Sequence, residues 1–101
     1  MSTPPRGLTF DAMPRYIVER TFSRTWDVGP DTPDRCRQII DRNGDDVTWL
    51  QSYVSEDGKK SFCMYEAVSP EAIRRSAARN DLPIDSITSV RVLDPYPYSR
   101  F

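Results

Sequence analysis

Residues 49–78 read WLQSYVSEDGKKSFCMYEAVSPEAIRRSAA, and this stretch is the strongest indication of the fold class. Its first part, extended back by two residues, is rich in β-branched and aromatic side chains, which favours a strand over 47–54. Asp57-Gly58 is a dipeptide typical of a hairpin turn, in which glycine takes a positive φ. A second strand is expected over 61–67, so the two strands form an antiparallel hairpin.

The hairpin runs directly into a helix with clear start and stop signals. Ser69 can accept hydrogen bonds from the free backbone N–H groups of a first turn. Pro70 suits the first helical position because its missing donor costs nothing there. Glu71 adds negative charge where the helix dipole favours it. The helix is expected to end near Asn80, before Pro83.

The flanks complete a regular order of elements. They add a strand over 15–22, a helix from Asp31 or Thr32 to Gly44, and a final strand over 86–93. The order strand–helix–strand–strand–helix–strand predicts an α+β protein of the ferredoxin-like βαββαβ class. In that class a four-stranded antiparallel sheet carries two helices on one face.

Length and composition indicate a single small domain. The chain has 101 residues, enough for one modest core. We expect a ferredoxin-like domain over 14–93. A flexible N-terminal arm (1–13) and a C-terminal tail (94–101) flank it, because both ends contain proline and lack periodicity.

Charge and hydropathy exclude several classes of function. The net charge is −1 and the pI about 5.3, so nothing favours binding to nucleic acid or to an anionic membrane. No apolar run approaches the roughly 20 residues that span a bilayer, and no secretory leader is expected. Cys36 and Cys63 are expected to be buried, reduced thiols, which places the protein in the cytoplasm.

Both faces of the predicted sheet carry apolar side chains. Side chains alternate between the faces of a strand, so Val47, Trp49 and Tyr53 are expected on one face and Leu50 and Val54 on the other. Two helices can cover only one of these faces. A second copy of the chain is the simplest cover for the other face, which predicts a homodimeric α/β barrel. The alternative is a monomer whose tails fold across the sheet.

Short motifs give the chain a resemblance to a known family. They are RYIVER at 15–20, CMYEA at 63–67, SPEAIR at 69–74 and LPIDSI at 82–87. Over about 13–93 the chain resembles a family of small, mostly uncharacterised bacterial proteins described in general terms as nickel-binding. The resemblance implies a dimeric ferredoxin-like α/β barrel and nickel as the ligand class.

The histidines of that family have no counterpart in this chain. The nickel-binding relatives carry histidines on the first and second strands, where this chain has Arg20, Thr21 and Thr48. Imidazole is a preferred ligand of nickel, and the chain contains no histidine. We therefore assign no metal ligand and no cofactor from the sequence.

Charged and aromatic residues within the predicted strands are the candidates for a site. Glu19, Arg20 and Glu66 are expected to form a polar floor in the space between two subunits, with Trp49 and Tyr53 as aromatic walls. The alternative is that these charges point to water at an edge strand, or form a structural Glu–Arg pair.

These observations favour a small homodimeric protein that binds a small-molecule ligand or a metal without catalysing a reaction. The alternative is a cofactor-independent enzyme of the dimeric α/β-barrel type, monooxygenase-like or cyclase-like, acting on a small aromatic compound. An enzyme would need a cavity with a titratable group of perturbed pKa, whereas a binding protein needs only a complementary pocket.

Overall fold

The computed structural model describes residues 13–26 and 29–96, and within them the elements follow the expected order. They are strand β1 (Arg15–Thr21), helix α2 (Thr32–Asn43), strand β2 (Val47–Val54), strand β3 (Lys60–Ala67), helix α3 (Pro70–Arg79) and strand β4 (Ser86–Val90). The βαββαβ prediction is confirmed. The expected N-terminal arm, apart from Met13, and the end of the expected tail lie outside the described residues.

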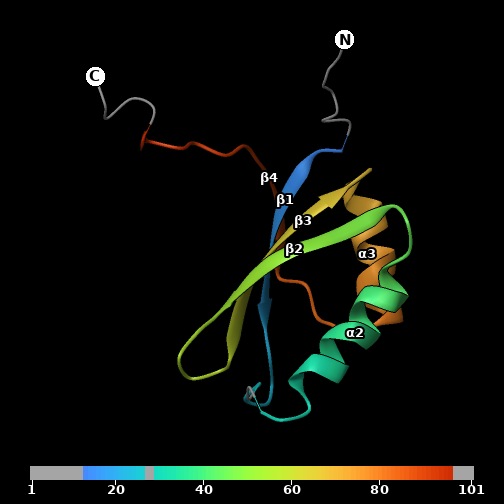
Figure 1. Cartoon of the computed structure of the whole chain (residues 1–101), viewed down its shortest axis with the longest axis vertical. Helices are drawn as coiled ribbons and strands as arrows, with labels where there is room; N and C mark the ends of the chain where they lie inside the picture. The colour runs from blue at the N-terminus through green and yellow to red at the C-terminus, as the bar shows by residue number, and fades with distance from the viewer. Residues whose placement is uncertain (1–12, 27–28, 97–101) are drawn as a thin grey trace.

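The strands form one antiparallel sheet in the order β2-β3-β1-β4. Both helices lie on the same side of this sheet (Figure 1). Strand β4 is shorter than expected, because Val90 pairs with Arg15 at the start of β1. The preceding Pro14 has no N–H to continue the ladder, so the predicted extension of β4 to Leu93 is wrong.

The turn between β2 and β3 depends on one glycine. Gly58 has a φ of +72°, as the Asp57-Gly58 dipeptide predicted. The Gly58 N–H donates to the Ser55 carbonyl over 2.8 Å, and the Ser55 N–H donates to the Lys60 carbonyl over 2.9 Å. A residue with a side chain would be strained in this left-handed conformation.

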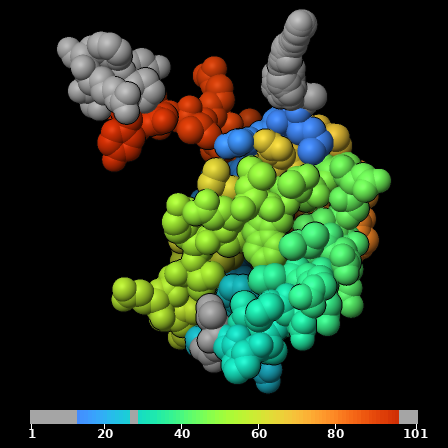
Figure 2. Space-filling model, viewed as in Figure 1, coloured from blue at the N-terminus to red at the C-terminus, as the bar shows by residue number. Residues whose placement is uncertain are grey.

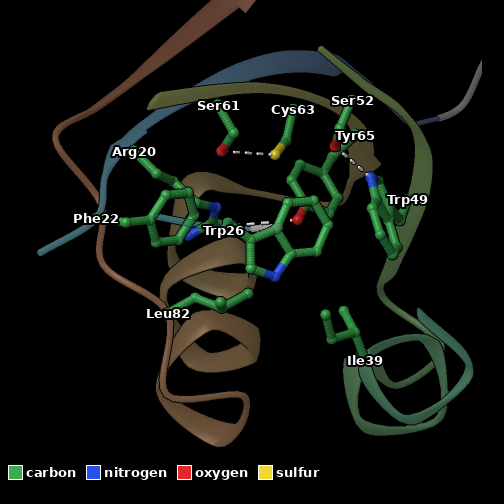
Figure 3. A pocket seen from close by; sticks show the side chains of 10 residues that line it. All are labelled: Arg20, Phe22, Trp26, Ile39, Trp49, Ser52, Ser61, Cys63, Tyr65 and Leu82. Atoms are coloured by element: carbon green, nitrogen blue, oxygen red, sulfur yellow. Dashed lines mark hydrogen bonds between the residues drawn. The ribbon is translucent and has the colours of Figure 1, made fainter. Parts of the chain in front are cut away.

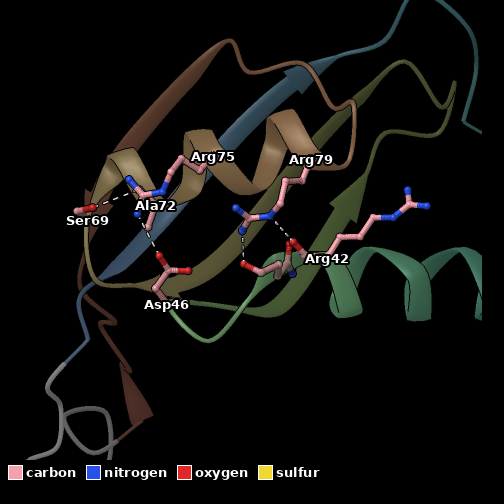
Figure 4. A network of polar contacts seen from close by, with 7 residues as sticks. Arg42, Asp46, Ser69, Ala72, Arg75 and Arg79 are labelled. Atoms are coloured by element: carbon pink, nitrogen blue, oxygen red, sulfur yellow. Dashed lines mark hydrogen bonds and ion pairs between the residues drawn. The ribbon is translucent and has the colours of Figure 1, made fainter.

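Side chains at the helix ends fix how the helices sit. The Ser69 hydroxyl accepts a hydrogen bond from the Ala72 N–H over 3.2 Å, which confirms the predicted cap of α3. At the far end of α3, Arg79 donates to the carbonyls of Arg42 and Asn43, each over 2.6 Å (Figure 4). A cation on the last carbonyls of α2 also complements the helix dipole, so one arginine ties the two helices together.

The core lies between the sheet and the helices. Its buried members are Tyr16, Val18, Val47, Cys63, Tyr65, Ala67, Ala72 and Ile73, with Trp49, Ile84 and Ile87 packed against them. Cys63 is buried and Cys36 is half-buried, and both are free thiols. Within the described residues, neither helix is long and apolar enough to cross a membrane.

A bulge in β2 changes which side chains share a face. Trp49 pairs with Tyr65 and Gln51 pairs with Met64, so two steps along β2 match one step along β3 and Leu50 is extra. Beyond this point every side chain of β2 faces the side opposite to the simple alternation. The expectation that Trp49 and Tyr53 share a face is therefore wrong.

Candidate functional site

The structure separates the candidate residues onto the two sides of the sheet. Glu19, Tyr53 and Glu66 lie on the side away from the helices, which we call the open face. Arg20 and Trp49 lie on the helix side. Glu19 and Arg20 are neighbours on β1 and must point to opposite sides, while the bulge separates Trp49 from Tyr53. The predicted single pocket is thus two separate places.

The carboxylates on the open face have partners other than Arg20. Arg15 Nε lies 3.3 Å from Glu66 Oε2, and both side chains are about one-third exposed. The Ser86 hydroxyl donates to Glu19 Oε2 over 3.2 Å. The alternative of a structural Glu–Arg pair therefore holds for Glu66, with Arg15 as the arginine.

Apolar side chains fill the middle of the open face. Ile17 pairs with Met64 and Tyr53 pairs with Phe62. Tyr53 is 61% exposed and Phe62 is 37% exposed, so large aromatic area faces outward. Neither α2 nor α3 covers this side (Figure 1).

The described part of the C-terminal segment does not cover the open face. Val92, Leu93 and Tyr96 are 64%, 78% and 70% exposed. Residues 91–96 project from the rest of the molecule (Figure 2). The described residues therefore give no support to the alternative of a monomer whose tail folds across the sheet.

On the helix side, a small cavity of about 30 Å³ lies between the sheet, α2 and the loops at one end. Since one water needs about 10–15 Å³ on this measure, the cavity has room for a group of two or three heavy atoms. Its walls are Arg20, Phe22, Trp26, Ile39, Trp49, Ser52, Ser61, Cys63, Tyr65 and Leu82 (Figure 3). We call this the aromatic cavity.

Arg20 is the charged group of the aromatic cavity, and it is only 3% exposed. Its Nη1 donates to the Pro83 carbonyl over 2.6 Å, and its Nη2 donates to the Tyr65 hydroxyl over 3.1 Å. The guanidinium carbon also lies 5.9 Å from the centre of the Tyr65 ring, in cation–π contact. Its Nε is buried and has no hydrogen-bond partner among the described residues. No described carboxylate forms an ion pair with Arg20.

Tyr65 is held in its neutral form. Burial raises the pKa of the Tyr65 hydroxyl, and the nearby Arg20 charge opposes that shift without cancelling it. The phenol therefore stays protonated at neutral pH. It can accept from Arg20 and donate its own proton, but it does not act as a base.

Trp26 separates the aromatic cavity from a wider depression. Its ring stacks on Phe22 with centroids 6.4 Å apart, and the Arg35 guanidinium lies 5.0 Å from the ring centre. Its backbone N–H donates to the Gly58 carbonyl over 2.8 Å. A Cβ at Gly58 would lie 2.5 Å from Thr25 Cγ2, so this close approach requires glycine.

The wider depression holds about 710 Å³ and shares Phe22, Trp26 and Leu82 with the aromatic cavity. Its remaining wall includes Arg24, Arg35, Asp81 and several hydroxyl groups, and Arg35 lies 3.9 Å from the Asp31 carboxylate. Together the two spaces give an apolar inner end that contains one cation, and a polar outer end with charges of both signs.

Sequence reasoning found Arg20 and Trp49 but missed most of this wall. Phe22 has the same parity on the first strand as Tyr16, Val18 and Arg20, and that pattern was a usable signal. Trp26 lies in a loop, where sequence periodicity carries no information. Its position depends on the contact with the distant Gly58 turn.

The donor set does not fit a nickel site within one chain. No group of three or more His, Cys, Asp or Glu side chains among the described residues could hold a metal. Of the three positions where the resemblance led us to expect histidine, Arg20 is a buried cation and the Thr21 hydroxyl donates to Asp85 over 2.5 Å. Thr48 is exposed on the open face.

Comparisons with known proteins agree with the fold. The model of a family described as "Nickel responsive protein SCO4226-like" matches residues 16–90, well over half of the chain. The crystal structure of SCO4226 from Streptomyces coelicolor A3(2) is similar, with a TM-score of 0.65 and 15% sequence identity. The similarity covers 79% of this chain and 99% of that one. No curated protein matches the sequence.

Proposed function

Because this chain belongs to the SCO4226-like family of nickel responsive proteins, we propose that it is a small binding protein that functions as a homodimer. In this proposal the open faces of two copies pack against each other and enclose a space for a small ligand or a metal. The free thiols Cys36 and Cys63 support a reducing compartment, the cytoplasm, as its location.

The exposed apolar centre of the open face is the observation that carries the proposal. Ile17, Met64, Phe62 and Tyr53 form a continuous group across the three strands β1, β3 and β2. Leaving Tyr53 and Phe62 in water forgoes the free energy of burying two aromatic side chains, on the order of 2 kcal/mol each. An apolar patch with charged residues around it is typical of an interface between proteins.

The charges on the open face suit a second copy of the same chain. Arg15 and Glu66 lie at one end of the strands and Glu19 and Lys60 lie nearer the other. A two-fold axis that crosses the strands reverses their direction between the two copies. Arg15 of one copy can then meet Glu19 of the other, and Glu66 can meet Lys60. Glu19, Tyr53 and Glu66 would then border the space between the sheets.

Placing a charge in the middle of the open face tests this assembly. Phe62→Glu puts a carboxylate where the two copies are proposed to meet, and an unpaired buried charge costs several kcal/mol. Sedimentation should give twice the 11.7 kDa chain mass for the unchanged protein at micromolar concentration, and the single-chain mass for Phe62→Glu.

Ile40→Glu is the matched control. Ile40 is 56% exposed on α2, on the opposite side of the sheet, so a charge there should leave the dimer intact. A dimer broken by Ile40→Glu and kept by Phe62→Glu would place the interface on the helices. A monomeric parent protein would remove the proposal.

A further inference from the structure

We propose that the aromatic cavity is a second binding site, and that its ligand is a small organic carboxylate whose carboxylate group meets Arg20. This site lies on the helix side of the sheet and does not depend on the space between two open faces. The occupant follows from charge, from the shape of the guanidinium and from the composition of the walls.

The buried positive charge of Arg20 favours an anionic ligand. A cation that is 3% exposed has lost nearly all of its hydration, which is costly unless an opposite charge replaces it. Its two hydrogen-bond acceptors, the Pro83 carbonyl and the Tyr65 hydroxyl, are both neutral. The ion pairs among the described residues all involve other arginines.

The position of the free donor points to the same class of ligand. Arg20 Nε is buried without a partner among residues 13–26 and 29–96, and the residue lines the aromatic cavity. In the close view the guanidinium extends behind Phe22 toward the Tyr65 hydroxyl (Figure 3). Arginine N–H groups form a planar fork that matches the two oxygens of a carboxylate. The neutral Tyr65 phenol and the Ser61 hydroxyl offer further hydrogen bonds within the same walls.

The walls select the rest of the ligand. Phe22, Trp26, Trp49 and Ile39 present rings and an aliphatic chain, which suit a flat apolar body. The inner volume of about 30 Å³ has room for a carboxylate group and little else. The body of the ligand would therefore extend past Trp26 into the depression of about 710 Å³, whose wall is polar and carries charges of both signs.

A purely structural role for Arg20 does not account for all of these features. The bond to Pro83 joins β1 to the loop after α3, and this structural role uses Nη1 alone. Among the described residues it leaves the buried Nε without an acceptor and the positive charge without an ion-pair partner. An anion in the cavity would satisfy both.

Titration of the unchanged protein with a matched pair of compounds tests the proposal without any variant. Benzoate and benzamide have nearly the same shape, but only benzoate carries charge. We expect millimolar benzoate to shift the Arg20 Nε–H signal in a nitrogen–proton NMR spectrum and to change the fluorescence of Trp26 and Trp49. Benzamide should bind about ten- to a hundredfold more weakly, the range for a hydrogen-bonded charge. Equal effects of both compounds, or none from benzoate, would overturn the proposal.

Two variants of β1 show on which side of the sheet benzoate binds. Arg20→Gln should abolish benzoate binding, whereas Arg15→Gln, on the open face of the same strand, should leave it unchanged. If Arg20→Gln does not fold, the NMR signal of the unchanged protein still decides. The dimer-breaking Phe62→Glu should keep benzoate binding, so failure of this site and failure of the homodimer are separate results.

One further variant tests whether a carboxylate of the chain itself pairs with Arg20. Asp27 follows Trp26 in the sequence and lies outside the described residues. Benzoate binding should be the same in Asp27→Asn as in the parent. Binding seen only in Asp27→Asn would mean that a carboxylate of the chain itself holds Arg20, and would overturn the proposal.

Discussion

At the scale of single residues, Arg15 and Arg20 show how strongly the position on a strand determines the role of a side chain. Both belong to β1. Arg15 lies on the open face, is partly exposed, and pairs with Glu66. Arg20 lies on the helix side and is 3% exposed, and its acceptors in the described part of the chain are neutral. The exposed pair is worth about 1 kcal/mol or less, whereas the buried cation is costly and needs a functional or structural reason.

Gly58 is the residue whose replacement should most clearly disturb the cavity wall. Gly58→Ala would place a methyl group 2.5 Å from Thr25 Cγ2 in a left-handed conformation. We expect the free energy of unfolding to fall by roughly 1–3 kcal/mol. Because Trp26 donates to the Gly58 carbonyl, its fluorescence should change as well. Thermal unfolding followed by tryptophan emission measures both effects.

Gly29→Ala serves as the control for that substitution. Among the described residues, a Cβ at Gly29 would meet Asp31 Oδ1 alone, at an ordinary 3.6 Å. This change should be close to neutral. If the two alanine variants unfolded at the same temperature, the close packing of the Gly58 turn on the Trp26 segment would be refuted.

At the scale of elements, the bulge of β2 and the caps of the helices decide which side chains meet. Leu50 is the extra residue of the bulge, and it moves Tyr53 to the open face while Trp49 stays on the helix side. Arg79 of α3 donates to the last carbonyls of α2, so one side chain joins the two helices into a layer over the sheet. The aromatic cavity lies between the sheet and α2, and Ile39 of α2 forms part of its wall (Figure 3).

The cap of α3 gives a prediction at this scale. Ser69→Ala removes the acceptor of the Ala72 N–H and should lower the free energy of unfolding by about 1 kcal/mol. Ser69→Asp keeps an acceptor oxygen at the cap and should retain the stability of the parent. Urea unfolding followed by circular dichroism compares the three proteins. Equal loss in both variants would mean that the hydroxyl itself, rather than capping, matters at this position.

At the scale of the whole molecule, the sheet separates two different environments. The open face combines exposed aromatic side chains with paired charges, which suits assembly. The helix side encloses a cavity with a buried cation, which suits an anionic ligand. Neither environment offers, among the described residues of one chain, the cluster of donors that a tightly held metal needs.

Nickel binding should accordingly be weak. The chain has no histidine, which is a preferred ligand of nickel, and the buried Arg20 cation on β1 would repel a metal ion held near it. Titration calorimetry of protein without any tag should show no stoichiometric site of sub-micromolar dissociation constant. Such a site would contradict the prediction, and Glu66→Gln and Cys63→Ser would then show whether the carboxylate or the thiol supplies it.

The order of the elements, the Gly58 turn, the Ser69 cap and the ferredoxin-like class were all predictable from the sequence alone. These features depend on local patterns: β-branched runs, a turn dipeptide, a capping residue and proline at the first helical position. The family resemblance was also visible in the sequence, and the family model confirms it over residues 16–90.

The tertiary structure decided which side chains share a site. One extra residue in β2 reversed the faces of the β2 side chains that follow it. The loop that carries Trp26 is positioned by a hydrogen bond to a turn more than 30 positions away in the chain. Neither effect has a local signature, because each depends on pairing between distant segments. The sequence therefore predicted Arg20 and Trp49 as candidates, but only packing showed that they belong to a buried cavity, apart from Glu19, Tyr53 and Glu66.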